Sequence, residues 1–407
     1  MKASPPVGTQ STPRSRASRK VLLLWAFFRP HPLGIALAVR GAAFAKHLRR
    51  LGYEVIVAVP AYPDMPPPAG AIPIETLESL RHRFGRIQAL IRLPRALLGL
   101  VRFVRRMQPD VIVVSQPTYT LPIQGLIASK VAGIPMVLDM QDIFLQERDF
   151  FPKDWTSEIK LSIEGIVCRF SNRIIAVLPE MARLACRGHR VPSAKFDVLY
   201  NGVDLEEVVL DMDSQGGKDI DLLHLGAPRP YYGTERFVEA IGTLAKERPS
   251  TRVVFTDFQG TEYQKSIVEL VRAKGLERTV RFLSQLSSEE VIQLMYRSKV
   301  GVYTSYGSPN SRVVVGTKVF EYMAYGLPVA YLGAEDNEAA RIIREAGAGE
   351  IANTPSEFAE RVRRLIEDEG LRASIRQNAL LAAAQYDWGK SVPIVFQRHV
   401  GPLMNVR

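Results

Sequence analysis

The feature that most constrains the fold of this chain is a regular alternation of short, continuous apolar runs with segments of helical periodicity. Runs at 21–28, 54–60, 110–115, 135–140 and 173–179 each have the length of a strand, and helical patterns lie between them. Continuous apolar runs are typical of strands that are buried on both faces of a parallel sheet. Because strands that alternate with helices build βαβ units, the first half of the chain is predicted to be doubly wound.

The same alternation restarts after a polar, glycine-bearing break at 211–219. Further apolar runs follow at 220–226, 252–258, 280–284, 300–305 and 328–333. A length of 407 residues also suits two domains, at about 150 residues each. The predicted fold class is therefore α/β, with two Rossmann-like doubly wound domains that face a central cleft. Ligands of such sheets bind at the carboxyl ends of the strands, so this cleft is the expected site.

The composition excludes several classes of protein. Hydrophobic residues make up 46% of the chain and charged residues 23%, as in globular proteins rather than disordered or collagen-like ones. The two cysteines, Cys168 and Cys186, exclude a disulfide framework and predict a reducing compartment. No C-x-x-C or H-E-x-x-H metal motif occurs, and no apolar run reaches the ~18 residues of a spanning helix. Residues 1–19 lack an apolar core and are expected to form a disordered basic tail, not a secretion signal.

The positive charge is confined to the first half of the chain. Residues 1–200 hold 28 Lys/Arg against 14 Asp/Glu, whereas residues 201–407 hold 25 against 28. Such an asymmetry indicates an anionic partner surface near the first half, either phospholipid or nucleic acid.

Within that half, the segment 81–108 contains eight arginines and no acidic residue. Leucines and isoleucines lie between the arginines at helical intervals, and Pro94 is expected to kink the helix or to start a second one. This pattern predicts an interfacial membrane helix, with Arg102, Arg105 and Arg106 at the lipid surface. A core-facing helix with a solvated arginine face is the alternative. Nucleic acid is not expected, because few aromatic residues accompany the arginines and no binding motif is present.

The segment 316–329 carries the clearest chemical pattern. It predicts a helix with Lys318 in its first turn and Glu321 on the same face, ended by Gly326 before a strand. A helix N-terminus with a lysine suits a diphosphate, and a glutamate can accept hydrogen bonds from ribose hydroxyls. The alternative is a surface Lys–Glu pair on an amphipathic helix.

The same segment, GTKVFEYMAYGLPV, resembles the "(P/G)-x-K-x-F-E-Y-M-A-x-G-x-P-V" signature of family-4 glycosyltransferases. Four other segments resemble motifs of that family in the expected order: LDMQDIF (138–144), YNGVD (200–204), HLGAPRPYYGTERFVEAI (224–241) and YDW (386–388). The resemblance covers roughly residues 20–400 and implies a GT-B fold. It implies an acceptor-binding domain at 20–200, a nucleotide-sugar-binding domain at 201–388, and a helix at 389–407 that crosses back to the first domain.

The resemblance implies retaining transfer of a sugar from a nucleotide-sugar donor to a hydroxyl acceptor, without a cofactor or a metal ion. The acceptor we expect is a lipid-linked saccharide or glycolipid, and the enzyme is expected to be cytoplasmic and peripheral on the inner face of the plasma membrane. Lys318 and Arg229 are the candidate catalytic cations for the leaving diphosphate, and Asp142 is the candidate for orienting the acceptor hydroxyl. The predicted donor-binding residues are Glu321, Gly233, Tyr306, Ser308, Asn310 and Thr317, and His31 and Gly34 are predicted on the acceptor side.

Three positions depart from the family pattern. Val313 stands where many relatives have an earlier glutamate, Tyr232 where the family often has lysine, and Gln141 where many members have histidine or arginine. Charge stabilisation then rests on Lys318 and Arg229, with Arg312 as a further candidate. Two alternatives therefore stay open: a non-catalytic GT-B protein that binds a nucleotide-sugar or a membrane, and a nucleotide-sugar epimerase.

Overall fold

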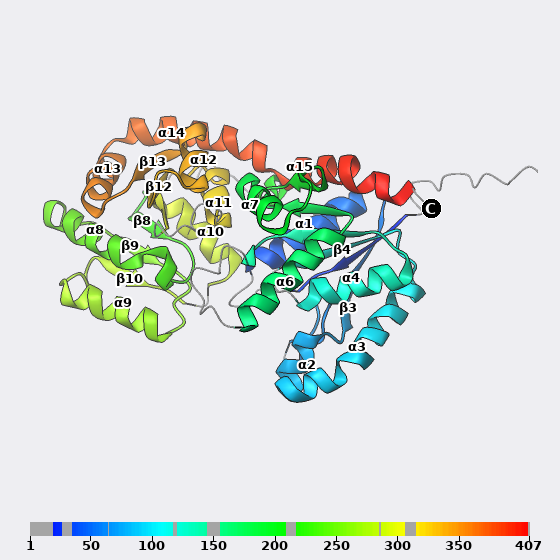
Figure 1. Ribbon diagram of the computed structural model, residues 1–407. Coiled ribbons are helices and arrows are strands. Elements are labelled where there is room, and N and C mark those ends of the chain that lie inside the picture. The colour runs from blue at the N-terminus through cyan, green and yellow to red at the C-terminus, as the bar shows by residue number, and fades with distance from the viewer. Residues whose placement is uncertain are drawn as a thin grey trace, which may run out of the picture. The chain divides into compact units, whose positions relative to one another are not determined.

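The chain divides into two compact units, each with a parallel sheet (Figure 1). The computed structural model describes residues 19–26, 35–63, 65–116, 120–144, 155–208, 217–284, 286–305 and 315–405. Unit 1 comprises Met1–Val177, Ala182–Leu199 and Val392–Arg407, and unit 2 comprises Leu178–Met181 and Tyr200–Ser391. The last segment of the chain, which begins within α15 (Trp388–Val395), therefore belongs to unit 1.

Unit 1 is built on a parallel sheet of seven described strands in the order β3-β2-β1-β4-β5-β6-β7. The strands are β1 (Lys20–Leu24), β2 (Glu54–Pro60), β3 (Ala71–Ile74), β4 (Val111–Gln116), β5 (Met136–Met140), β6 (Arg173–Ala176) and β7 (Phe196–Val198). Every residue of β4 and β5 is buried, as the continuous apolar runs predict for strands covered on both faces. The order turns back between β1 and β4, so the predicted doubly wound topology is confirmed.

Helices connect these strands. They are α1 (Ile35–Arg50), α2 (Leu77–Phe84), α3 (Arg86–Met107), α4 (Thr120–Ala132), α6 (Trp155–Phe170) and α7 (Pro179–His189). α3 packs on α4, and α4 packs on α6, so these three helices are neighbours in one layer (Figure 1). The outward side chains of this layer form one continuous surface of unit 1.

The basic segment 81–108 is divided at Gly85 and not at Pro94. Gly85 has a φ of 79°, a left-handed value that glycine adopts without strain, and it ends α2 and precedes α3. Helix α3 then runs through Pro94 without ending. The expectation that Pro94 starts a second helix is therefore wrong. Proline removes one backbone donor, and the carbonyl it leaves free belongs to Leu90, whose exposed position gives it access to water.

Unit 2 contains a parallel sheet of six described strands in the order β10-β9-β8-β11-β12-β13. The strands are β8 (Ile220–His224), β9 (Val253–Phe255), β10 (Val280–Phe282), β11 (Ser298–Thr304), β12 (Val329–Leu332) and β13 (Gly349–Ala352). The helices are α8 (Thr234–Glu247), α9 (Glu262–Ala273), α10 (Ser288–Arg297), α11 (Thr317–Ala324), α12 (Glu338–Ala346), α13 (Pro355–Glu367) and α14 (Glu369–Ala383). Their apolar side chains meet in a core around Phe237, Phe255 and Val300.

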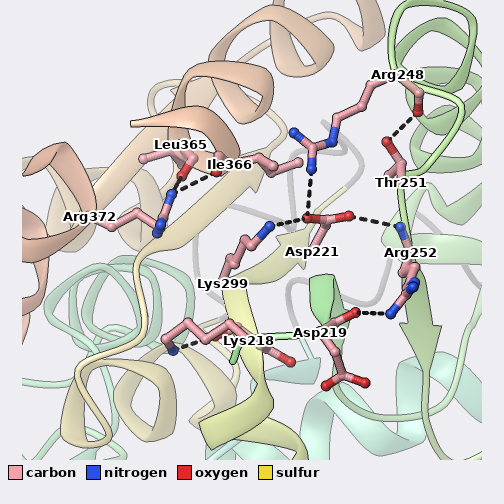
Figure 2. A network of polar contacts seen from close by, with 11 residues as sticks. Lys218, Asp219, Asp221, Arg248, Thr251, Arg252, Lys299, Leu365, Ile366 and Arg372 are labelled. Carbon is pink, nitrogen blue, oxygen red and sulfur yellow. Dashed lines mark hydrogen bonds and ion pairs between the residues drawn. The ribbon is translucent and has the colours of Figure 1, made fainter. Parts of the chain in front are cut away.

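A polar network holds the amino ends of three strands of unit 2 together (Figure 2). The buried carboxylate of Asp221 accepts a hydrogen bond from Lys299 Nζ at 2.7 Å and one from the backbone N–H of Arg252 at 3.0 Å. Arg248 Nη2 lies 3.7 Å from the same carboxylate. Asp221 thus joins the starts of β8, β9 and β11. The carboxyl ends of the strands, where ligands of such sheets bind, lie at the opposite edge.

Candidate active site

A glycine turn at the carboxyl end of the unit 2 sheet holds a lysine. Gly226 follows β8 with a φ of +85°, and its N–H donates to Thr256 Oγ1 at 2.8 Å, beyond the end of β9. A Cβ atom built on Gly226 would lie 2.2 Å from Lys318 Nζ. A larger residue would have to displace the ammonium group, so glycine is required both for the backbone conformation and for the approach of the lysine.

Lys318 is the second residue of α11, and the side chain of Tyr322 anchors this helix to the sheet. The hydroxyl of Tyr322 accepts a hydrogen bond from the N–H of Leu225 at 2.9 Å and donates to the carbonyl of Leu223 at 3.0 Å. The N-terminal cap is Gly316, which has no side chain to bond the N–H groups of the first turn. The positive end of α11 and the ammonium of Lys318 are therefore presented at the same place.

Four ionisable side chains act on one another at this edge of the sheet. Burial lowers the pKa of Lys318 and Arg229 adds to the effect, while the negative charges of Glu321 and Asp257 oppose it. Burial raises the pKa of Glu321, opposed by Lys318 and by a hydrogen bond with Thr317. The group combines two cations with two carboxylates, and it can bind an anion together with hydroxyl donors.

Aromatic rings lie beside two basic side chains at this site, Lys318 and His224. The ammonium of Lys318 lies 5.4 Å from the centroid of the Tyr232 ring, a distance that suits a cation–π interaction. Beneath it, the buried His224 packs between the rings of Phe237 and Phe255. Burial, and after it the charge of Lys318, lowers the pKa of His224 to about 3. Burial at this position therefore favours the neutral form of the imidazole.

In unit 1, three polar residues, Asp139, Gln141 and Asp142, lie at or just beyond the carboxyl end of β5. Asp139 is fully buried in an ion pair with Arg40, whose Nη2 lies 2.8 Å from Oδ1, and it accepts a hydrogen bond from Gln141 Nε2 at 2.6 Å. Asp142 is exposed, yet the chain around its carboxyl and then the charge of Glu164 raise its pKa to about 6.

Comparison with known proteins shows which family this chain belongs to. The family model "Glycosyltransferase Family 4" matches residues 38–207, and the model "Glycosyl transferases group 1" matches residues 213–381. The chain belongs to glycosyltransferase family 4. The resemblance of the 316–329 segment to that family is therefore confirmed.

Relatives of this chain are distant in sequence. A D-inositol 3-phosphate glycosyltransferase from a Nocardioides species is 23% identical over 289 residues, which cover 65% of this chain and 61% of the relative. The chain therefore matches less than two thirds of the length of that relative. HepE from Anabaena, solved in complex with UDP and glucose, is 20% identical with a TM-score of 0.70 over 95% of this chain and 99% of that one. WaaG, a glycosyltransferase involved in lipopolysaccharide biosynthesis, is 15% identical with a TM-score of 0.67 over 94% and 100%. These similarities in structure confirm the GT-B fold.

The structure brings together some of the predicted site residues. The charges of Glu321 and Arg229 act on the pKa of Lys318, and the side chain of Thr317 forms a hydrogen bond with Glu321. Gly233 is the N-terminal cap of α8 and adopts the left-handed conformation. Several predicted residues lie outside the described residues: His31, Gly34, Tyr306, Ser308 and Asn310, together with Arg312 and Val313. Within the described ranges, no three His, Cys, Asp or Glu side chains gather as ligands for a metal ion.

Sequence analysis missed two charged residues of these sites. Asp257 lies within the apolar run expected at 252–258 but two residues beyond the end of β9, and it has a φ of 56°, a left-handed value that is uncommon for a residue other than glycine. Glu164 is buried on α6, and the signal that could have found it is an acid within the apolar run LSIEGIVC. A charge at such a position needs buried partners.

The basic helix α3 carries apolar side chains on two faces, one buried and one exposed. Ala96, Leu100 and Val104 are buried, while Ile87 and Ile91 are 77% and 74% exposed. The predicted lipid-facing residues Arg102, Arg105 and Arg106 are exposed, and Arg105 Nη2 donates to the carbonyl of Val131 at 3.0 Å. None of the described helices combines the length and the hydropathy that crossing a membrane requires.

Proposed function

We propose that this protein transfers a sugar, with retention, from a UDP-sugar to a hydroxyl of a lipid-linked saccharide or glycolipid, and that it does so without a metal ion. The observation that carries the donor half of the proposal is the ammonium of Lys318, held against Gly226 at the N-terminus of α11. The binding of UDP by HepE, a protein of the same fold, supports uridine as the base.

In this proposal, unit 2 stabilises the leaving group. The bond between the anomeric carbon and the diphosphate oxygen breaks while the acceptor oxygen bonds to the same carbon. Negative charge develops on the diphosphate, which takes up the proton of the acceptor hydroxyl. Lys318, Arg229 and the positive end of α11 face that charge in a partly buried setting, where electrostatic stabilisation is stronger than in water. Glu321 accepts hydrogen bonds from the ribose hydroxyls, and Asp142 in unit 1 orients the acceptor hydroxyl.

Binding of nucleotide-sugars tests the donor half. A panel of UDP-, GDP-, ADP- and dTDP-sugars is assayed by thermal shift. The UDP-sugar is expected to stabilise the protein by about 2.7 kcal/mol when present at about 100 times its dissociation constant. Stabilisation without turnover on any acceptor would favour the non-catalytic alternative. Conversion of the free nucleotide-sugar into its epimer would favour the epimerase.

Chelation tests the proposal of metal independence. Because Lys318, Arg229 and the end of α11 supply positive charge to the diphosphate, turnover is expected to continue unchanged in EDTA. The assay compares rates with EDTA alone and with EDTA plus excess magnesium. A loss of activity in EDTA that magnesium restores would contradict the proposal.

The lipid half of the proposal rests on the surface of unit 1. Exposed isoleucines and leucines of α3 lie among its exposed arginines, and the neighbouring helices add Ile127 and Val131 of α4 and Trp155, Ile159, Ile166 and Phe170 of α6. These apolar side chains are exposed on one helical layer, which is the arrangement of a surface that rests in a lipid interface. The arginines supply attraction of about 1 kcal/mol each to anionic headgroups.

Vesicle binding tests this surface. Replacing Arg102, Arg105 and Arg106 by Gln is expected to weaken sedimentation with anionic vesicles and to reduce its salt dependence, because exposed charges are screened beyond about 8 Å at physiological ionic strength. Replacing Ile87 and Ile91 by Ser is expected to weaken binding even at low salt.

A matched control removes the same charge from unit 2, at the exposed Arg272, Lys274 and Arg278, and should leave vesicle binding unchanged. Both α3 variants should slow transfer to a lipid-linked acceptor more than hydrolysis of the donor. Equal binding of the wild-type protein to neutral and anionic vesicles, or binding to neither, would contradict the lipid surface and favour a soluble acceptor.

A further inference from the structure

Glu164 is a buried carboxylate that joins three separate parts of unit 1. Its Oε2 accepts hydrogen bonds from the backbone N–H of Phe144 at 2.5 Å and from Gln116 Nε2 at 3.2 Å, and its Oε1 lies 2.7 Å from His189 Nε2. The side chain is 1% exposed. Next to it, Gly165 leaves room for the imidazole of His189, since a Cβ there would lie 2.9 Å from Nδ1. Such a set of partners satisfies a buried carboxylate.

Two of these contacts reach the carboxyl edge of the sheet, where Asp142 is located. Gln116 is the last residue of β4, and Phe144 is two residues beyond Asp142 in the segment that follows β5. On the other side of Asp142, the amide of Gln141 is bonded to Asp139, which is itself paired with Arg40. The segment that carries Asp142 is therefore held at both ends by buried charged groups.

We propose that Glu164 is a positioning residue of the acceptor side, which fixes the 141–144 segment so that Asp142 presents its carboxyl to the acceptor hydroxyl. This inference rests on the proposed function, because it assigns Glu164 a role through Asp142. In this arrangement Asp142 is exposed, whereas Glu164 and His189 are buried.

The charge of Glu164 also acts on the proton of Asp142. Desolvation of the carboxyl by the surrounding chain, and after it the charge of Glu164, raises the pKa of Asp142 to about 6. Among the described residues, two pairs of charged groups pack around this segment: Asp139 of β5 with Arg40 of α1, and Glu164 with His189 of α7. Lys160, also on α6, lies 5.2 Å from the centroid of the Phe144 ring. Removing the negative charge of Glu164 is expected to lower the pKa of Asp142, so that Asp142 stays ionised to lower pH.

Comparison of Glu164→Gln with Glu164→Ala distinguishes the effect of the lost hydrogen bonds from the effect of the lost charge. The amide oxygen of the Gln variant can still accept the N–H of Phe144, whereas the Ala variant loses both the acceptor and the charge. The first measurement is the titration of the Asp142 carboxyl by carbon-13 NMR, assigned with Asp142→Asn. The midpoint, near pH 6 in the wild-type protein, is expected to move to lower pH in Glu164→Gln. Hydrogen exchange at the Phe144 amide is expected to speed up in Glu164→Ala but not in Glu164→Gln.

The second measurement is steady-state transfer as a function of pH. The acid limb of kcat/KM for the acceptor is expected to follow the Asp142 midpoint to lower pH in Glu164→Gln. Glu164→Ala is expected to lower kcat/KM for the acceptor by about tenfold, as the loss of a charged hydrogen bond does. The KM of the donor should change in neither variant. Glu158→Gln, the same change at an exposed position of the same helix, is the matched control.

An unchanged Asp142 midpoint in folded Glu164→Gln would overturn the inference, and so would an equal rise in the KM values of donor and acceptor. The titration and the exchange require no turnover. They therefore test the positioning by Glu164 even if no acceptor is found for the enzyme, and that result would count against the proposed function alone.

Discussion

Lys318→Ala is expected to lower kcat by about 100-fold or more, which is the effect of removing one preorganised group that stabilises charge in a transition state. The ammonium of Lys318 is held against Gly226 and over the Tyr232 ring, so it reaches its place before the substrate binds. The measurement is single-turnover transfer at saturating donor. Circular dichroism and thermal unfolding establish that the variant is folded.

Two further variants examine the geometry of the lysine. Lys318→Arg keeps the charge but has a larger head group, and it is expected to restore activity only in part because Gly226 leaves little room. Gly226→Ala is expected to impair transfer by displacing the ammonium and by straining the left-handed turn. Lys246→Ala, at an exposed position of α8, is the control. A wild-type rate in folded Lys318→Ala would show that the diphosphate is stabilised elsewhere.

The strands of the fold were predictable where they are continuous, apolar and fully buried, and missed where they are short and only partly buried. All residues of β4 and β5 are buried, and both strands follow from their sequences. The missed strands are β3, with the sequence AIPI, β7, with FDV, and β13, with GEIA. Each contains a proline, a charged residue or a glycine, which strands disfavour, and β3 and β7 lie at the edges of a sheet, where burial is weaker.

The part of the site that lies on one segment of the sequence could be predicted. Lys318 and Glu321 lie three residues apart on a helix, so their common face follows from helical geometry. Asp257 and Tyr232 reach Lys318 from other segments, and their proximity depends on the pairing of β8 with β9 and on the turn at Gly226. Neither relation has a signal in the sequence, because sequence periodicity reports which face of an element is buried and not which elements are neighbours.

Arg40→Met is expected to destabilise unit 1 by about 3 to 5 kcal/mol, the cost of breaking a buried ion pair by removing one partner. Both side chains of the Arg40–Asp139 pair are fully buried, and Arg40 Nη1 also donates to the carbonyl of Leu199 at 3.0 Å. Without the guanidinium, the carboxylate of Asp139 keeps Gln141 as its partner but loses its countercharge. Urea unfolding monitored by circular dichroism measures the loss, with Arg49→Met, at an exposed position of α1, as the control.

The double variant Arg40→Met, Asp139→Leu distinguishes the cost of an unpaired charge from the value of the pair. If the destabilisation comes from the orphaned carboxylate, the double variant should recover most of the lost stability, because apolar residues of similar volume often replace buried ion pairs without loss. Its transfer activity should not recover, since Gln141 would still lack the Asp139 carboxylate that holds it beside Asp142. Equal stability of Arg40→Met and Arg49→Met would contradict the assignment of Arg40 as a buried partner. Recovery of stability without activity would instead show that this pair is retained in order to place the acceptor-side segment.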